Sequence, residues 1–373
     1  MTDGQGISPA NMLVMVAAGG TGGHLFPAES LSAALAKRGI DTVLATDNRA
    51  AKYSEHFKSM VVVPSATFRG RDPIAILRTG TTLAYGLFKA LMMVHKVKPS
   101  VVVGFGGYPS VPPVFAASLL KIPTVLHEQN AVMGRANRFL ASRVSAIATG
   151  FAGVTDKDKA LAIKTSCIGN PLRPAVLAAT GIQYPAIEPN GPLHMLVFGG
   201  SQGARIMADI VPPAVAKLPP HLQMRLRIVQ QVREEDMPRV RDIYTRAQVA
   251  HEIAPFFTDL PARMAASHLV VSRSGAGTVA ELSAIGRPGI LVPLPHALDQ
   301  DQAANAAVLE KAGGAIRILQ KDFTPDRLAS EIDALAADPD RLATMAARAR
   351  GIGVLDAADR LADLVLKVAR VAA

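Results

Sequence analysis

Two glycine-rich turns, one in each half of the chain, limit the possible folds more than any other feature. AAGGTGG begins its glycine pair at Gly19, and VFGGSQG begins its pair at Gly199. Each turn follows a short apolar run and precedes a stretch typical of a helix, which begins at Pro27 in the first half. Apolar strands that alternate with helices indicate parallel sheets covered on both faces. We therefore predict an α/β protein of two doubly wound parallel-sheet domains, with the turns facing a cleft between them.

Length and composition agree with a two-domain protein of the cytoplasm. The 373 residues suffice for two domains, and the proline- and glycine-rich residues 170–192 are typical of a linker. No apolar run reaches the roughly 18–20 residues of a membrane-spanning helix. Residues 12–18 form too short an apolar run for a signal peptide and follow an acidic start. The single cysteine, Cys167, excludes a disulfide framework and a cysteine-based zinc site.

The net charge of +10 suggests an anionic partner, which could be a membrane surface, nucleic acid or an anionic substrate. Residues 73–127 contain no acidic residue, and residues 73–98 combine a helical apolar period with lysine and arginine. That pattern suits a patch that binds anionic lipid. It also describes an amphipathic helix packed on a sheet. Taken alone it favours the packed helix, because buried stripes are the commoner use of the pattern.

Polar residues follow three of the strands predicted in the first half. His24 comes directly after the first glycine turn, where a helix N-terminus can bind an anion. A neutral imidazole at this position can take a proton from a hydroxyl, and a structural histidine is the alternative. GFGGYPS (104–110) and the loop that carries Glu128 and Asn130 each follow a further strand. Two polar loops at adjacent strand ends favour a ligand site over helix capping.

Two further polar segments follow strands predicted in the second half. SRSGAGTVAEL (272–282) contains Thr278 and Glu281, which form either a capping box or, through Glu281, a site for a ribose diol. HALDQDQAANA (296–306) carries amide and carboxylate groups that suit sugar hydroxyls. Asp-x-Asp pairs occur three times and are read as helix starts, so we expect no metal ion and no cofactor.

Eight motifs, in order along the chain, resemble those of the MurG family: GGTGGHLFPA, FRGR, GFGGYPS, LHEQNAVMGRAN, GNPLR, VFGGSQGA, SRSGAGTVAE and DQDQAANA. MurG enzymes are bacterial glycosyltransferases that add N-acetylglucosamine (GlcNAc) from UDP-GlcNAc to undecaprenyl-pyrophosphoryl-MurNAc-pentapeptide. The resemblance implies a GT-B fold, in which two Rossmann-like domains face each other across a cleft. It implies an N-terminal acceptor and membrane-side domain at 8–172, with 353–373 packed back on it. It also implies a C-terminal UDP-GlcNAc-binding domain at 173–352.

The resemblance further implies roles for individual residues. The first glycine turn would meet the lipid pyrophosphate or the donor, and Asn130 would meet the donor sugar. Arg173 and Ser201 would meet the UDP phosphates, the backbone of Phe257 the uracil, and Gln302 the sugar hydroxyls. The full set of implied substrate-binding residues is Thr21, Gly22, Gly23, Asn130, Arg173, Ser201, Phe257, Ala276, Gly277, Thr278, Glu281 and Gln302.

In the implied reaction the MurNAc 4-hydroxyl attacks the anomeric carbon as UDP leaves, in one displacement with inversion. A base must take the hydroxyl proton, and His24 is the first candidate and Glu128 the second. Residues 73–98 align with the family's membrane-facing patch, which reverses the preference for a packed helix. The resemblance thus implies a peripheral protein on the cytoplasmic face of the bacterial inner (plasma) membrane. Its implied partners are UDP-GlcNAc, lipid I, the anionic membrane surface, and cell-wall and division proteins, without nucleic acid.

Three other functions compete with this interpretation. An NAD(P)-dependent dehydrogenase could use the same sheets, but only Asp47 stands near the place of a ribose carboxylate, and seven motifs would go unexplained. The charge of +10 would suit a non-catalytic protein of nucleic acid or membrane surfaces, but polar residues at strand ends favour a small-ligand cleft. Another UDP-sugar-dependent glycolipid transferase would share the donor site and differ in its acceptor.

Overall fold

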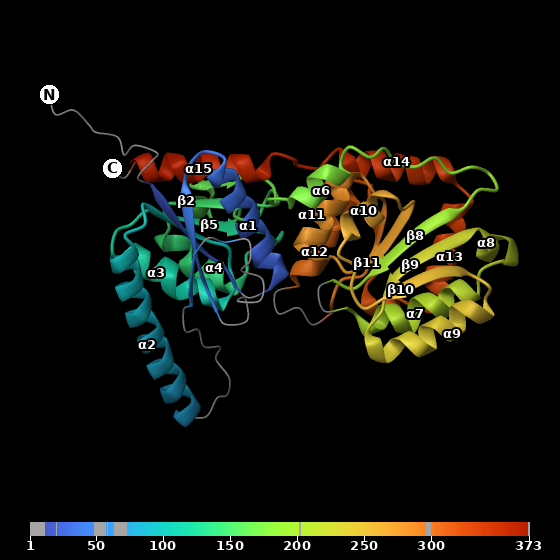
Figure 1. Cartoon of the computed structure of the whole chain (residues 1–373), viewed down its shortest axis with the longest axis horizontal. Helices are drawn as coiled ribbons and strands as arrows, with labels where there is room; N and C mark the ends of the chain where they lie inside the picture. Colours follow the sequence, from blue (N-terminus) through green and yellow to red (C-terminus); the bar gives the residue numbers. More distant parts are fainter. Residues whose placement is uncertain are drawn as a thin grey trace. The chain divides into compact units, whose positions relative to one another are not determined.

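The computed structural model of the chain describes residues 12–19, 21–47, 57, 59–62, 73–200, 203–295 and 300–371, and of 73–84 and 371 the backbone alone. The chain divides into two compact units, Met1–Arg173 with Leu355–Ala373, and Pro174–Val354. Each unit is built around one parallel sheet and is described here by itself (Figure 1). Among the described residues, no helix combines the length and the apolar character needed to cross a membrane.

The first unit is a seven-stranded parallel sheet in the order β3-β2-β1-β4-β5-β6-β7. Its strands are β1 (Leu13–Ala17), β2 (Asp41–Thr46), β3 (Met60–Val62), β4 (Val101–Gly104), β5 (Thr124–Glu128), β6 (Ala146–Thr149) and β7 (Thr165–Cys167). Its helices are α1 (Gly22–Ala36), α2 (Pro73–Val97), α3 (Val111–Leu119), α4 (Arg135–Leu140), α5 (Lys159–Ala162) and α15 (Ala357–Val371). The strand order reverses between β1 and β4, and doubly wound sheets bind ligands beyond the carboxyl ends of the strands at such a point.

Helix α1 begins at Gly22, five residues before the start that the sequence pattern predicted. Thr21 is its N-cap, and the Thr21 carbonyl accepts hydrogen bonds from the N–H groups of both His24 and Leu25 at 3.0 Å. The prediction placed Pro27 at the helix start, where proline is favoured, but Pro27 lies inside the helix. That prediction is wrong because the turn is tight enough for the helix to begin within it. His24 is consequently the third residue of α1.

The C-terminal helix α15 packs on α1 in the first unit (Figure 1). Leu361 and Val365 are buried in the same apolar cluster as Leu31 of α1. Arg38 Nη1, just after α1, lies 2.6 Å from Asp363 Oδ1. Because exposed ion pairs contribute little to stability, the buried apolar contacts hold α15 in place.

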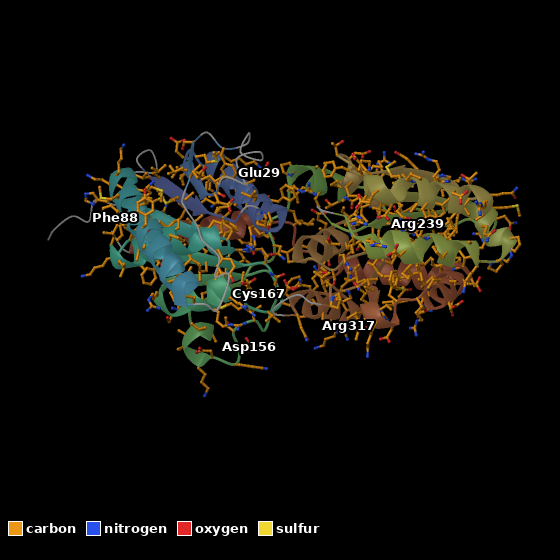
Figure 2. The ribbon with its side chains drawn as sticks, turned by 90° about the horizontal axis from the view of Figure 1, so that it is seen from below. Glu29, Phe88, Asp156, Cys167, Arg239 and Arg317 are labelled. Atoms are coloured by element: carbon orange, nitrogen blue, oxygen red, sulfur yellow. The ribbon has the colours of Figure 1, made fainter. Side chains whose placement is uncertain are left out.

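Helix α2 packs one face and exposes another. Ala90 and Val94 are fully buried, whereas Tyr85, Phe88 and Met92 are 53%, 61% and 57% exposed. These three side chains recur at helical spacing, and Phe88 is labelled on α2 in Figure 2. Within residues 85–97, one stripe of the helix packs inward and a second apolar stripe faces solvent, and the binding of lipid by the exposed stripe stays a prediction.

The second unit is a six-stranded parallel sheet in the order β10-β9-β8-β11-β12-β13, which reverses between β8 and β11. Its strands are β8 (Leu193–Phe198), β9 (Leu226–Gln231), β10 (Ala250–Ala254), β11 (Leu269–Ser272), β12 (Gly289–Leu291) and β13 (Ala315–Arg317). Its helices are α6 (Pro174–Ala179), α7 (Arg205–Ala216), α8 (Pro220–Arg225), α9 (Met237–Arg246), α10 (Leu260–Ala265), α11 (Ala276–Ile285), α12 (Asp301–Lys311), α13 (Pro325–Ala336) and α14 (Pro339–Arg350).

The two parallel sheets confirm the predicted fold class of doubly wound α/β units. Two of the Asp-x-Asp pairs lie at helix starts, as predicted: Asp158 and Asp338 cap α5 and α14 by accepting backbone N–H groups. The predicted linker, residues 170–192, contains helix α6. The assignment of the acceptor to one domain and of UDP-GlcNAc to the other stays a prediction.

Candidate active site

His24 stands at the carboxyl end of β1, at the point where the strand order of the first sheet reverses. Its Nδ1 atom lies 3.0 Å from the hydroxyl oxygen of the N-cap residue Thr21. The backbone N–H groups at the start of a helix point out of its N-terminus, and in α1 those of His24 and Leu25 are accepted by the Thr21 carbonyl. The result is an imidazole and a positive helix end at one strand terminus.

The glycines of the loop after β4 make room for the His24 ring. A Cβ atom added to Gly107 would lie 3.0 Å from Gly19 Cα and 3.4 Å from His24 Nδ1, and one added to Gly106 would lie 3.4 Å from His24 Nε2. The Gly19 N–H donates to the Gly106 carbonyl at 3.1 Å. Gly19 of the first motif therefore lies together with Gly106 and Gly107 of GFGGYPS beside the imidazole, although the sequence presents the two motifs separately.

The environment of His24 keeps the ring neutral. The protein surrounds most of the imidazole, and this burial lowers its pKa from 6.5 to about 4. Burial disfavours the charged form of histidine, and a helix N-terminus acts in the same direction. At neutral pH the ring therefore carries a lone pair that can accept a proton.

The second candidate base, Glu128, lies at the end of β5 and is only 2% exposed. Its Oε1 accepts from the backbone N–H and the side-chain amide of Asn130, at 3.0 and 3.2 Å. Its Oε2 accepts from the Gly134 N–H at 2.9 Å and from Asn137 Nδ2 at 2.8 Å. Burial raises the pKa of Glu128, and these hydrogen bonds oppose that rise. A carboxylate offers about four lone-pair sites, and four donors occupy them.

The loop that follows β5 is held by residues that the sequence reasoning did not single out. Asn137 joins Glu128 to the neighbourhood of His24, because its Nδ2 would lie 3.4 Å from a Cβ atom on Gly106. Asn170 Nδ2 donates to the Gln129 carbonyl at 3.0 Å. Buried His127 contacts the Gly169 carbonyl through Nε2 at 3.0 Å. These residues belong to the motifs LHEQNAVMGRAN and GNPLR, and membership of those motifs is the sequence signal that could have identified them.

Arg173 lies beside the first glycine turn. Its guanidinium carbon is 4.4 Å from the centre of the Phe26 ring. The same ring lies against Gly22, where an added Cβ atom would come within 2.9 Å of Phe26 Cε2. An alanine at position 22 would therefore force the Phe26 ring to shift. Gly23 differs, because a Cβ atom there would meet nothing within 4 Å.

In the second unit, α11 begins at Ala276 directly beyond the carboxyl end of β11. Its N-cap is Gly275, so the alternative of a capping box that starts at Thr278 is wrong. Gly277 is exposed, and a Cβ atom there would meet nothing within 4 Å. Thr278 and Glu281 are half-buried on the same helix. The segment therefore presents the N-terminus of a ten-residue helix at the end of the sheet where ligands bind.

Gln302 is tied to the start of α11 and to the loop after β12. The Ser274 hydroxyl donates to the Gln302 carbonyl at 2.8 Å. The Leu294 N–H donates to Gln302 Oε1 at 3.1 Å, which leaves the Nε2 group as the donor end of this amide. Buried Arg273 shapes the same loop by donating to the Val292 and Pro293 carbonyls, each at 3.0 Å.

The remaining predicted site residues of the second unit follow β8 and β10. Ser201 lies outside the described residues, as does FRGR at 68–71 in the first unit. Phe257 is buried after β10, and the Arg263 guanidinium stacks on its ring at 4.4 Å. Phe257 follows β10, whereas α11 follows β11. In the order of the sheet, strands β9 and β8 lie between β10 and β11.

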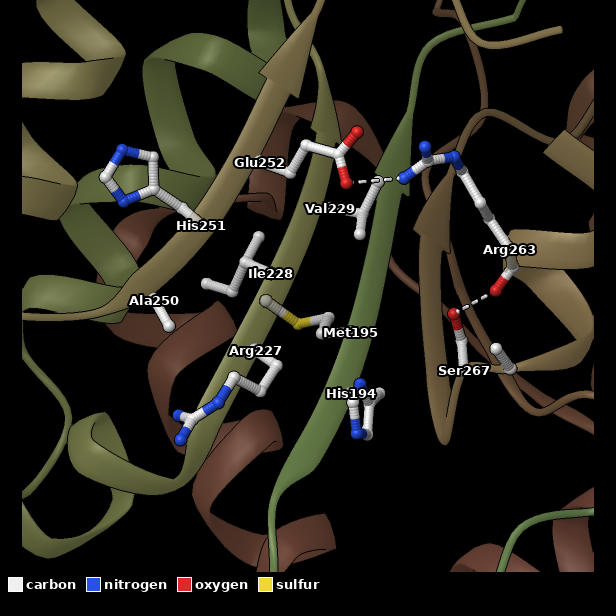
Figure 3. A pocket seen from close by; sticks show the side chains of 11 residues that line it. His194, Met195, Arg227, Ile228, Val229, Ala250, His251, Glu252, Arg263 and Ser267 are labelled. Carbon is white, nitrogen blue, oxygen red and sulfur yellow. Dashed lines mark hydrogen bonds and ion pairs between the residues drawn. The ribbon is translucent and has the colours of Figure 1, made fainter. Parts of the chain in front are cut away.

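A pocket of about 380 Å³ lies elsewhere in the second unit, over the amino-terminal halves of β8, β9 and β10. His194, Arg227 and Glu252 line it, and Figure 3 shows the ion pair between Glu252 and Arg263 at 2.7 Å. No residue singled out from the sequence lines this pocket. It lies away from the carboxyl ends of the strands, so we do not assign it to the active site. Within the described residues, no group of three or more His, Cys, Asp or Glu residues is arranged to hold a metal ion.

Comparison with known proteins matches both units. The Glycosyltransferase family 28 N-terminal domain matches residues 14–149, and the Glycosyltransferase family 28 C-terminal domain matches residues 194–361. A relative from Rhodopseudomonas palustris (strain BisA53) is 63% identical over 97% of both chains. It is named UDP-N-acetylglucosamine--N-acetylmuramyl-(pentapeptide) pyrophosphoryl-undecaprenol N-acetylglucosamine transferase. A relative of the same name from Nitrobacter hamburgensis is 61% identical over 96% of this chain and 97% of its own.

Solved structures agree with these relatives. The crystal structure of Acinetobacter baumannii MurG superposes with a TM-score of 0.77 at 27% identity and covers 95% of this chain and 99% of its own. A UDP-GlcNAc 2-epimerase from Neisseria meningitidis shares the fold, with a TM-score of 0.66 at 15% identity over 95% of this chain and all of its own.

Two doubly wound sheets, together with these matches, define a glycosyltransferase of the GT-B fold. Within that class the chain belongs to the MurG family.

Proposed function

We propose that this chain transfers GlcNAc from UDP-GlcNAc to the MurNAc 4-hydroxyl of undecaprenyl-pyrophosphoryl-MurNAc-pentapeptide, with inversion at the anomeric carbon. This reaction converts lipid I to lipid II in peptidoglycan synthesis. The observation that carries the proposal is the 63% identity, over 97% of the chain, to a relative named for this transfer.

The second unit binds the donor in this proposal. The open N-terminus of α11, from Ala276 to Thr278, holds the diphosphate through backbone N–H groups, and Glu281 holds the ribose. The open space at Gly277 supports close approach of the ligand to the backbone. Gln302 presents its Nε2 group to a sugar oxygen, because the Leu294 N–H already occupies Oε1. Ser201 and the backbone of Phe257 complete the phosphate and uracil contacts, and fixed donors stabilise charge on the leaving UDP.

The first unit binds the acceptor and supplies the base. The MurNAc O4 atom forms a bond to the anomeric carbon while the bond to the diphosphate oxygen breaks, and the O4 proton passes to His24. The lowered pKa of His24 supports this role, since the ring is neutral before substrate binds. An anionic diphosphate nearby favours the imidazolium and so raises the pKa of His24 as the complex forms.

Glu128 holds the loop after β5 in this mechanism, and does not act as the base. Its four accepted hydrogen bonds leave no lone pair for a substrate hydroxyl. Through two of these bonds it orients Asn130, which contacts the donor sugar. Arg173, Thr21, Gly22 and Gly23 gather at the start of α1, where they meet phosphate groups.

The protein works peripherally on the cytoplasmic face of the plasma membrane in this proposal. The exposed stripe of Tyr85, Phe88 and Met92 enters the interface, and Lys89 and Lys96 contact anionic headgroups. Cosedimentation with vesicles of phosphatidylglycerol tests this. Replacing Phe88 and Met92 by serine should weaken binding by at least about 10-fold, because each buried apolar side chain contributes roughly 1.5–3 kcal/mol. Met224→Ser is the matched control, since Met224 is 65% exposed in the second unit. Equal binding by the stripe variant would contradict the membrane role.

The catalytic proposal is tested with labelled UDP-GlcNAc and a lipid I analogue. Wild type should form the lipid-linked disaccharide, and His24→Ala should lose about 10²–10⁴-fold in kcat, the usual contribution of a general base. His24→Asn keeps a polar atom near Thr21 and should lose as much, because it cannot take the proton. Folded wild type that makes no product from lipid I, but uses another lipid acceptor, would indicate a different glycolipid transferase.

A further inference from the structure

Gln231, the last residue of β9, bridges the two strands on either side of its own. Its Oε1 accepts from the N–H of Gly199, the first residue after β8, at 3.1 Å. Its Nε2 donates to the carbonyl of Pro255, the first residue after β10, at 3.2 Å. The backbone pairing of β8 with β9 ends at Val197 and Gln230. The Gln231 side chain therefore extends the sheet's hydrogen bonding past the end of β8, where the loops begin.

The first of these loops needs such an anchor. A Cβ atom on Gly199 would lie 2.2 Å from the Ala204 nitrogen, so the backbone of Gly199 lies against that of Ala204. Gly200 and Gly203 both hold positive φ angles, 90° and 70°. Glycine adopts such conformations without steric cost, and it loses more conformational freedom on folding than any other residue. Among the hydrogen bonds of the described residues, Gln231 is the one side chain that accepts the Gly199 N–H.

The second loop leads from Pro255 to Phe257. The Phe257 ring is buried under the Arg263 guanidinium, which in turn pairs with Asp259 and Glu252, each at 2.7 Å. Arg263 fixes the side chain of Phe257, and Gln231 fixes the backbone two residues before it. The loop is thus held at two places, and one of them is shared with the loop after β8.

Only a primary amide of this length serves both bonds. The Gly199 N–H requires an acceptor and the Pro255 carbonyl requires a donor, and Gln combines both in one side chain. Glutamate can accept from Gly199 but cannot donate to Pro255. Methionine fills the same volume and does neither. Gln230, the preceding residue, faces the other side of the sheet and bonds to the Tyr244 hydroxyl.

We propose that Gln231 is a positioning residue of the donor site, which couples the phosphate-binding loop after β8 to the uracil-binding loop after β10. The inference rests on the proposed function for what the two loops bind. Both polar ends of the Gln231 side chain are bonded to backbone groups of the loops, so we assign it no contact with UDP or the sugar. It sets the distance between the two loops, and hence the fit of base and diphosphate at the same time.

The test compares the binding of UDP and of uridine to wild type, Gln231→Met, Gln231→Glu and the control Gln230→Met, by calorimetry or competition. Loss of the bridge should weaken UDP by about 10-fold, since UDP must fit both loops at once. Uridine should change by less than 3-fold, because it reaches one loop only. The KM for UDP-GlcNAc should rise in parallel while kcat stays within about 3-fold. Hydrogen exchange at the Gly199 amide should quicken in Gln231→Met and not in Gln230→Met.

Each outcome decides the matter. UDP binding by both Gln231 variants within 3-fold of wild type would overturn the inference. So would an equal loss for UDP and uridine, because Gln231 would then support only the base loop. A loss of UDP binding in Gln230→Met as large as in Gln231→Met would assign the effect to general destabilisation. Wild type that does not bind UDP would instead overturn the proposed function. That failure is seen in the wild-type measurement itself, so it is distinguished from a failure of the inference, which is seen only in the comparison with the variants.

Discussion

Replacing Glu128 by glutamine separates a loop anchor from a catalytic base. The two side chains have the same shape, so the loop after β5 can keep its path. Glutamine keeps one oxygen, which can still accept from the backbone and side chain of Asn130. It places an NH₂ group where Oε2 stood, and that group faces the Gly134 N–H and Asn137 Nδ2, both donors.

The size of the effect follows from these contacts. A buried donor left without an acceptor costs about 1–3 kcal/mol. Asn137 can rotate its amide and offer Oδ1, which has no hydrogen-bond partner among the described atoms, to the new NH₂ group. The Gly134 N–H loses its acceptor, Oε2 of Glu128, and rotation of the Asn137 amide does not replace it. We therefore expect Glu128→Gln to lose about 1–3 kcal/mol of unfolding free energy.

Urea unfolding and steady-state kinetics measure the two effects. If Glu128 is an anchor, kcat should fall by no more than about 10-fold, and the KM for UDP-GlcNAc should rise because Asn130 is less well held. A base would behave differently: kcat would fall by about 10²–10⁴-fold with the KM little changed. Such a loss in a variant as stable as wild type would refute the anchor role, and would move the base from His24 to Glu128.

Two further predictions follow from the same geometry. Gly23→Ala and Gly277→Ala should keep or slightly raise the melting temperature, since a Cβ atom meets nothing at either site. Both should lose at least about 10-fold in kcat/KM if ligand approaches the backbone there. Gly22→Ala is the control, which should destabilise through its clash with Phe26. Wild-type kinetics in Gly23→Ala would remove that turn from the substrate site. The free energy of unfolding should also decrease as the pH is lowered. Burial lowers the pKa of His127 from 6.5 to about 4, so the unfolded chain binds the proton more tightly. The folded state is thus fully stable above pH 6.5 and loses about 2 kcal/mol through this residue by pH 5, and about 3 kcal/mol below pH 4. His127→Gln should lessen the difference in unfolding free energy between pH 7 and pH 5, and an unchanged difference would mean that His127 titrates normally.

The fold was predictable because its signals are local. Strands of a parallel sheet are buried on both faces and appear as continuous apolar runs, as in β1 and β4. Asp158 and Asp338 cap the helices that directly follow them, so neighbouring residues suffice to recognise them. The start of α1 was mispredicted, because tertiary packing around the glycine turn outweighed the preference of Pro27 for a first turn.

The candidate site was predictable only in part. Motif order identified the family, and the comparisons confirm the fold, the family and the transferase class. The roles of individual residues stay predictions. Asn137, Asn170 and Gln231 were overlooked, because a buried amide in a sequence does not show which loops it joins.

The sequence by itself determined two doubly wound sheets, the glycine turns at their strand ends, and the polar residues gathered there. Tertiary structure alone decided what those residues can do. His24 is neutral because Gly106 and Gly107, some 80 positions away in the chain, close around its ring. Glu128 is bound by four donors because the loop from Asn130 to Asn137 folds back over it. Desolvation and hydrogen bonding depend on distance in space, and spacing along the chain does not record that distance.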